Sequence, residues 1–314
     1  MLLSFTLLSF PIFARANPRS SPASFLSASL WIRSLAALSS LQKNLIHTIS
    51  KDHFRDGWHK LRYESLDDSK LLETTSLDWN SLSKNPEYDS LYKKLENVGW
   101  IGLTQLLNEK ASATAVKEFY TSLILKENEY TGKHTWNKED LFAFICGEEV
   151  IVTANMIGLL LKIEGTEGDN EPSKSFDYND AWETISGKKE KFPDSQAKRK
   201  LLNVQAKLLH HFIGNSLWYK QGSLEYINQK DIWLLHCVWT GIKVNLAQII
   251  INEIKKTTSK SSMHCGFGPL VTALGQIAQT KMHQHKDMRV ICSPLSFKSQ
   301  IRFVQTTVKD SQVA

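Results

Sequence analysis

The sequence predicts a mainly α-helical fold, in which a single helical domain contains one small β-hairpin and is flanked by a flexible N-terminal leader and a C-terminal tail. Three observations support this prediction. Apolar residues recur at helical spacing through much of the chain, helix-capping residues precede several of these stretches, and one segment has the pattern of two strands around a turn. With 42% hydrophobic residues and nine tryptophans, the chain can bury a substantial core.

Composition divides the chain into four parts. Residues 1–50 form a leader with four basic side chains and no acidic one. Residues 51–89 are polar and acidic, as expected of a linker with at most one short helix. Residues 90–285 carry the helical patterns and make up the predicted domain, whereas residues 286–314 lose the pattern and are expected to be a polar tail.

The net charge of +6 conceals an uneven distribution. Residues 51–180 contain 15 basic and 24 acidic side chains, whereas residues 181–314 contain 19 basic and 8 acidic ones. This asymmetry can indicate an anionic partner for the basic half. The simpler interpretations are that the two halves pack against each other or that the charges are solvated, and the dispersed basic residues favour these.

The helical periodicity becomes clear after residue 97. Residues 98–107 and 115–123 each place apolar side chains along one face of a helix. Residues 141–152 contain two short β-prone runs around Gly147 and predict a hairpin with a short turn. Thr153 then stands where the N-cap of the next helix is expected.

The second half has the clearer helix signals. Asp194 is expected to cap a helix that Gly214 closes, and Asp231 is expected to cap a helix that ends at Gly241. The last helix is expected to open within the sequence GFGPLVTALGQIA, where Pro269 stands in the first turn.

The stretch Trp233–Lys256 is the most apolar interior run, and it also contains histidine, cysteine and asparagine side chains that could do chemistry. We interpret it as two helices around a short corner, with Asn245 and Gln248 forming a start similar to a capping box. At roughly 1.5–3 kcal/mol for each fully buried large side chain, its apolar residues contribute much of the core. Asn245 is therefore expected to be a cap and not a catalyst.

The N-terminus allows three interpretations. Leu2–Phe13 is an apolar segment followed by Ala14, Arg15 and Ala16, a small-x-small arrangement that signal peptidase could accept, but no basic side chain precedes it. The residues after it are rich in serine and arginine, as in organellar transit peptides, and a leader without any address is the third interpretation. This segment is too short to span a bilayer and later apolar runs are interrupted by polar residues, so we expect no transmembrane helix.

The sequence contains no motif for a known catalytic site: it has no glycine-rich phosphate loop, no GxSxG and no HExxH. A transposase or integrase needs acidic residues that converge on two divalent metal ions. In the helical second half the interior candidates are Asp231 and Glu253, and each is better explained as a cap or a solvated position. We therefore expect no catalytic residue.

Candidate metal ligands are scattered. The four cysteines stand at positions 146, 237, 265 and 292 without a CxxC spacing, which also argues against a disulfide framework. His236, His264, His283 and His285 accompany them, but no pair has the short spacing that presents two ligands on one loop or helix face. We therefore expect no metal site and no cofactor.

A cluster of basic residues lies between Gly187 and Lys200. Its members are Lys188, Lys189, Lys191, Lys198, Arg199 and Lys200. Clustered lysine and arginine side chains neutralise phosphates and give salt-dependent binding without sequence recognition, so these six are the candidate nucleic-acid-binding residues. A solvated lysine loop is the simpler interpretation, and a nuclear-import patch is another.

Three blocks of sequence, in a fixed order, resemble a known family. Gly99–Leu123 has a tryptophan-containing helix followed by a valine-x-glutamate-phenylalanine-tyrosine helix, Phe144–Gly165 has a strand, a glycine turn and a short helix, and Ile227–Ile277 has a helix pair and a closing helix. In these blocks the chain resembles the putative plant transposon protein domain of plant proteins related to long-terminal-repeat retrotransposons. That pattern often has arginine before the turn glycine, where this chain has Cys146.

The resemblance carries no established catalytic residues. It implies a non-catalytic, transposon-derived protein that binds protein or nucleic acid, or associates with itself. The alternatives are a metal-dependent nuclease or recombinase of transposition and a self-associating structural protein akin to a capsid precursor. The resemblance favours the nucleus or cytoplasm, whereas residues 1–50 leave organelle import or secretion open.

Overall fold

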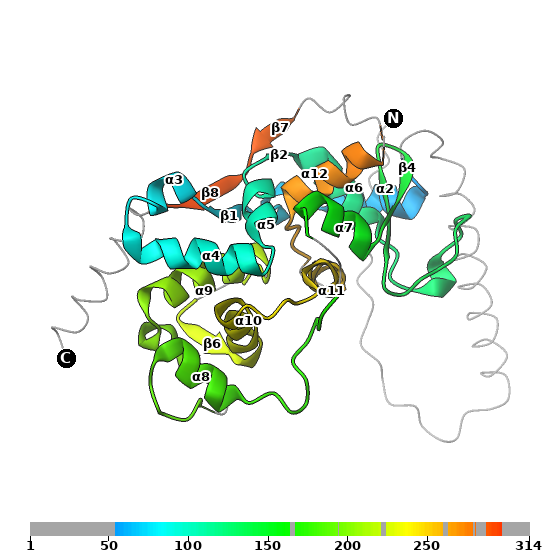
Figure 1. Ribbon diagram of the computed structural model, residues 1–314. Helices are drawn as coiled ribbons and strands as arrows, with labels where there is room; N and C mark the ends of the chain where they lie inside the picture. Colours follow the sequence, from blue (N-terminus) through cyan, green and yellow to red (C-terminus); the bar gives the residue numbers. More distant parts are fainter. Residues whose placement is uncertain are drawn as a thin grey trace, which may run out of the picture. The chain divides into compact units, whose positions relative to one another are not determined.

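The computed structural model describes residues 54–163, 167–193, 195–220, 224–259, 263–278, 280 and 287–296. Helices predominate in this part of the chain, and the strands form small two-stranded sheets (Figure 1). The mainly helical prediction is therefore confirmed. The predicted leader, residues 1–50, and Asp194 lie outside the described residues.

The α-helices of the described residues are short. They are α2 (Gly57–Ser65), α3 (Trp79–Leu82), α4 (Asp89–Asn97), α5 (Ile101–Leu106), α6 (Ala113–Ser122), α7 (Ala154–Leu161), α8 (Tyr178–Ser186), α9 (Val204–Ser216), α10 (Gln229–Thr240), α11 (Leu246–Thr258) and α12 (Gly268–Ile277). Single 3₁₀ turns are η1 (Asp68–Lys70), η2 (Pro86–Tyr88), η3 (Glu127–Glu129) and η4 (Arg199–Leu201). Within the described ranges, every helix is too short or too polar to cross a bilayer.

The strands form four pairs in the described part of the chain. The predicted hairpin is present as antiparallel β3 (Leu141–Ile145) and β4 (Glu148–Val152). Three further pairs were not predicted, because strands of three or four residues show no recognisable alternation. They are β1 (Thr74–Leu77) parallel to β8 (Cys292–Leu295), β2 (Lys110–Ser112) antiparallel to β7 (Met288–Val290), and β5 (Gln196–Lys198) antiparallel to β6 (Tyr226–Asn228).

The hairpin turn requires two residues with positive φ. Cys146 has φ 54° and Gly147 has φ 79°, as in the two-residue loops that match the twist of a hairpin. The backbone N–H of Cys146 donates a hydrogen bond of 2.8 Å to Oε2 of Glu118 in α6. A buried carboxylate from a neighbouring helix therefore fixes the turn.

Two of the predicted helix caps are confirmed. The Thr153 side chain accepts a hydrogen bond from the Met156 amide at 3.2 Å, and the Asn245 side chain accepts one from the Gln248 amide at 2.9 Å. Gly241, with φ 78°, ends α10 as expected.

Two other predicted helix starts are wrong. Helix α9 begins at Val204 and is capped by Asn203, well after Asp194. Helix α10 is capped by Asn228, and Asp231 is its third residue, whose carboxylate accepts the Asn228 amide at 2.8 Å in a capping box. In both cases a nearby asparagine satisfies the first free amides of the helix, which is the physical requirement for a cap.

Residues 54–89 do not form the linker that their polarity predicts. They contain α2, β1 and α3, and they contribute Leu77, Leu82 and Tyr88 to the core. In the same way, residues 287–296 of the predicted tail form β7 and β8. The polar side chains of β1 are buried with partners of their own: the Thr74 hydroxyl donates to the Leu107 carbonyl, and the Ser76 hydroxyl donates to Oδ1 of Asn108. An apolar-periodicity criterion does not detect such a strand.

Helix α6 packs against elements from several parts of the chain. It packs on α2, on β3 of the hairpin and on α12, and Figure 1 shows α6, α7 and α12 gathered near β4. In another part of the same view, α10 packs on α8, on α9 and on β6. The predicted core stretch forms α10 and α11, where Leu234, Ile250 and Ile254 are fully buried, while Trp239 is partly exposed.

Gly102 marks a close approach between two helices. A Cβ atom on this residue of α5 would lie 1.7 Å from the backbone oxygen of Leu161 at the end of α7. No side chain fits at that distance, so the packing of α5 on α7 requires glycine here.

Replacing Leu295 by alanine should lower the free energy of unfolding by about 2 kcal/mol, because this residue of β8 is only 6% exposed. Val290 in the neighbouring β7 is 58% exposed, and its replacement by alanine should change stability by less than about 0.5 kcal/mol. Urea unfolding of the two variants measures the difference. Equal effects would contradict the packing of β8 against the core.

Candidate nucleic-acid interface

The predicted basic cluster lies on a segment that is anchored to the core at one aromatic residue. Helix α8 ends at Gly187, which has φ 71°, and the lysines follow. Phe192, which is 6% exposed, has its ring centroid 5.6 Å from that of Trp182, and its amide donates to Oδ1 of Asn179 at 3.0 Å. Phe192 therefore anchors this segment to the core, and the charged residues on both sides of it extend from that anchor.

Most of the predicted basic residues are at the surface. Lys189, Lys191, Lys198 and Lys200 are exposed, and Lys188 is partly exposed. Among the described residues, none of these five lysines forms an ion pair, so their ammonium groups can meet an external anion. Three of them lie between α8 and β5, and the other two lie in β5 and η4.

Arg199 differs from its neighbours. Its side chain is partly buried, and Nη2 donates to the carbonyl of Lys207 at 3.3 Å. Its amide donates to the carbonyl of Glu225 at 2.7 Å. Burial lowers the pKa of the guanidinium from its usual value. These contacts make Arg199 a link between η4, α9 and the chain before β6.

The β5–β6 pair places an aromatic residue beside the exposed lysines. Ala197 and Ile227 are paired and fully buried. Lys198 and Tyr226 are the next pair, and Tyr226 is 41% exposed. Tyr226 was not predicted as a site residue, because neither three-residue strand is visible in the sequence. The apolar Ile227 between polar residues is the one signal that could have indicated it.

The two acidic residues considered for a nuclease site are both buried and both paired with lysine. Asp231 is fully buried, forms an ion pair with Lys220 and lies 3.6 Å from Nε2 of His210. Glu253 pairs with Lys230 at 2.6 Å and with Lys256 at 3.3 Å. Each carboxylate is thus neutralised by an ammonium group in its own part of the fold.

The environment of Asp231 favours its charged form. Burial alone raises the pKa of a carboxyl, but the nearby His210 imidazole and the charge of Lys220 outweigh it and hold the pKa below its usual value. An ionised, hydrogen-bonded carboxylate suits a capping role. It does not suit a general acid, which would have to be protonated near neutral pH.

Among the described residues, the thiols and imidazoles do not converge. Within the described ranges, no group of three or more histidine, cysteine or acidic residues could hold a metal ion. Burial raises the pKa of Cys237 and of Cys265 to about 12, so both thiols are protonated at neutral pH and are poor nucleophiles. His283 and His285 lie outside the described residues.

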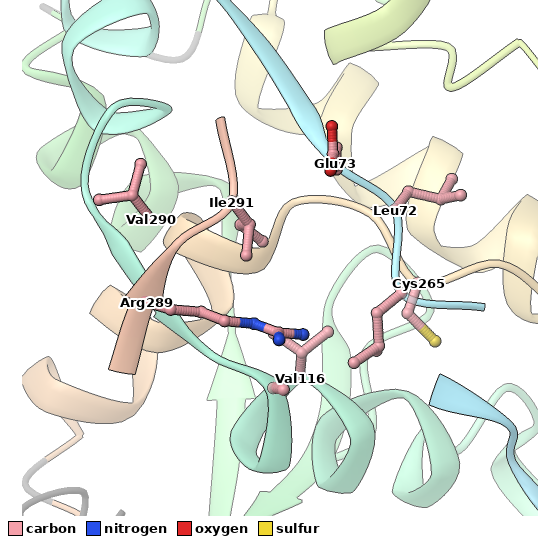
Figure 2. Close-up of a pocket in the computed structure, with 9 residues that line it drawn as sticks. Leu72, Glu73, Val116, Cys265, Arg289, Val290 and Ile291 are labelled. Atoms are coloured by element: carbon pink, nitrogen blue, oxygen red, sulfur yellow. The ribbon is translucent and has the colours of Figure 1, made fainter. Parts of the chain in front are cut away.

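A small pocket lies where β7, α6 and the segments before β1 and α12 meet. Its volume is about 260 Å³, and it is lined by Leu71, Leu72, Glu73, Ala113, Val116, Cys265, Arg289, Val290 and Ile291. Figure 2 shows the Arg289 side chain lying across the pocket toward Val116, well apart from Glu73. The lining is mostly apolar and its thiol is protonated, so we assign no reaction to this pocket.

A family model described as "Putative plant retrotransposon-related domain" matches residues 96–281, more than half of the chain. The chain belongs to this family. No curated protein and no solved structure matches it.

The family range covers α5 to α12, the hairpin and the β5–β6 pair with all six predicted basic residues. It leaves out β1, β7 and β8. Because β7 pairs with β2 and β1 packs on α9, residues on both sides of the matched range complete its packing.

The glutamate of the family-like block in α6 has a defined role. Glu118 is fully buried and holds the Cys146 amide, at the position before the turn glycine where the family pattern often has arginine. Its carbonyl oxygen lies 3.2 Å from Nε2 of His59 in α2, and His59 is also buried. Burial and the nearby charge of Arg55 lower the pKa of His59 to about 4.

Replacing Asp231 by alanine should lower the free energy of unfolding by about 3 kcal/mol, because Lys220 and the Asn228 amide lose a buried partner. Asp180 occupies the same third position of α8 but is exposed, so Asp180→Ala should cost no more than about 1 kcal/mol. Denaturant titration of both variants measures the two costs. A stable Asp231→Ala protein would contradict the structural role of this carboxylate.

The folded chain should lose stability as pH falls from about 6.5 toward 4, because the unfolded state protonates His59 in this window and the folded state does not. A shift to about 4 corresponds to at most about 3 kcal/mol. His59→Gln removes this linkage and should flatten the fall in stability between pH 7 and pH 5 by about 2 kcal/mol.

The matched control for this measurement is His134→Gln, because the His134 side chain is 62% exposed. Equal pH dependence of the original chain and His59→Gln would show that the pKa of His59 is the same in the folded and the unfolded state.

Proposed function

We propose that this chain is a non-catalytic, retrotransposon-related module that binds nucleic acid with the exposed lysines of the segment 188–200. The observation that carries the proposal is a set of five lysines without an ion-pair partner among the described residues. They are Lys188, Lys189, Lys191, Lys198 and Lys200. Family membership supports a connection with retroelements, and the excess of basic residues after position 180 supports an anionic partner.

The mode of binding follows from the residue type. Lysine is a compact, mobile point charge, which suits phosphate oxygens but does not read base edges. Each lysine that meets a phosphate releases condensed counterions, so affinity should fall steeply with salt. The predicted behaviour is binding without sequence preference.

The non-catalytic part of the proposal rests on the interior acids. A nuclease or recombinase needs carboxylates free to bind two metal ions. Asp231 and Glu253 are instead engaged by lysines, and neither is exposed. Strand cleavage with Mg²⁺ or Mn²⁺ that is lost in an Asp231→Ala protein shown by circular dichroism to be folded, but kept in Asp180→Ala, would favour the enzyme alternative.

The test is a salt titration of nucleic-acid binding by the full chain and by a variant in which Lys189, Lys191, Lys198 and Lys200 are changed to glutamine. Each phosphate contact contributes roughly 0.7–0.9 to the slope of log affinity against log salt concentration. If all four lysines contact phosphates, the slope should become shallower by about 3, and affinity at low salt should fall.

The matched control changes four exposed lysines of the acidic part to glutamine, at Lys84, Lys93, Lys133 and Lys174. It has the same net charge as the test variant, so any difference reports position and not total charge. No binding at low salt, or equal losses in the two variants, would overturn the proposal. Light scattering that showed a concentration-dependent oligomer without nucleic-acid binding would instead favour the self-associating alternative.

A further inference from the structure

We infer that the exposed surface of the β5–β6 pair binds a single-stranded nucleic acid, with a base stacked on Tyr226 and the adjoining phosphates on Lys198 and Lys200. This inference rests on the proposed nucleic-acid function and specifies the kind of strand and the aromatic contact.

The register of the strands places these groups together. In an antiparallel pair, alternate residues face opposite sides, and residues directly opposite each other have Cβ atoms about 5 Å apart. Ala197 and Ile227 are buried, so the Lys198–Tyr226 pair belongs to the outward side. An ammonium group and an aromatic ring are therefore neighbours at the surface.

Tyr226 is unusual among the exposed aromatic residues. Trp58 and Tyr92 are also exposed, but they lie in the acidic part of the chain, and the Tyr92 ring packs edge-on against Trp79 at 5.1 Å. In the described part of the molecule, no aromatic ring packs against Tyr226. Tyr226 therefore presents a ring that no other aromatic side chain covers, next to an exposed lysine.

The charge around Tyr226 is complementary to phosphate. The residues of β5, η4 and β6 include Lys198, Arg199 and Lys200 and no acidic residue. Glu225, just before β6, is the nearest acidic residue in sequence, and its carbonyl holds the Arg199 amide. Arg199 thus fixes the two strands, while the lysines on either side of it remain exposed.

A single strand fits this chemistry better than a duplex. A base can stack on an aromatic side chain only when it is not already stacked and paired within a helix, and such stacking tolerates any base. Lysines beside the ring then track the backbone. A duplex would use the lysines but not the ring, and an acidic peptide would use the charge alone.

The experiment measures fluorescence anisotropy of the full chain with a labelled single strand of about 12 thymidines and with a duplex of the same length. Tyr226→Thr removes the ring and retains the β-branched preference for a strand, and Tyr226→Phe retains the ring. We expect Tyr226→Thr to weaken single-strand binding by about 5- to 100-fold with an unchanged salt slope. We expect Tyr226→Phe to bind within about 2-fold of the original chain.

Two further measurements separate charge from stacking. Lys198→Gln should make the salt slope shallower by about 0.7 for the single strand. Duplex affinity should not respond to Tyr226→Thr. Circular dichroism confirms that each variant is folded before its affinity is compared.

The outcomes distinguish this inference from the proposed function. Salt-dependent binding that Tyr226→Thr leaves unchanged overturns the inference and leaves the lysine interface standing. Displacement of the strand by polyglutamate at equal charge concentration also overturns it, because that result identifies an acidic peptide as the occupant. No binding of either strand form removes both the proposed function and this inference.

Discussion

The fold depends on how helix α6 satisfies polar groups that it carries into the core. Glu118, Thr121 and Ser122 are all fully buried in this helix. The Glu118 carboxylate holds the hairpin turn, and the Ser122 hydroxyl accepts the Phe144 amide of β3 at 2.7 Å. An unpaired polar group in the interior can cost several kcal/mol. Any shift of α6 relative to the hairpin would break these contacts, so the contacts fix the two elements in one relative position.

The same helix also orders the N-terminal part of the described chain. Nε2 of His59, near the start of α2, lies within hydrogen-bond distance of the Glu118 carbonyl oxygen. Arg55, just before α2, donates a hydrogen bond to the carbonyl oxygen of Ser122. These bonds explain why a segment that looks like a linker is integrated into the structure. The polar side chains there serve as hydrogen-bond partners for α6, so their polarity does not mean exposure to solvent.

The features that could be predicted from the sequence are those with a long apolar period or a local capping signal. The helices α6, α7, α10 and α11 follow from apolar spacing, and the caps Thr153 and Asn245 follow from position. Strand β1 could not be predicted, because its sequence TTSL has no apolar alternation and its burial depends on a partner far along the chain.

The candidate site shows the same limit at the level of single residues. Lys198, Arg199 and Lys200 are equivalent in a sequence pattern, but the short strand and the 3₁₀ turn that follows it direct Arg199 inward and leave both lysines exposed. Tyr226 joins them through strand register, which is a long-range property. Sequence clustering therefore identified the charged segment but could not separate its structural member from its exposed ones.

The parallel pairing of β1 with β8 has a consequence for the order in which the chain can fold. Thr74 bonds the carbonyl of Ile291, a separation of 217 residues. Closing so distant a contact is slow, and a ribosome delivers the N-terminal strand long before its partner. During synthesis the backbone groups of β1 therefore cannot pair with β8 until that strand has been made. The three hydroxyl-bearing residues of β1 can form hydrogen bonds with water in the meantime.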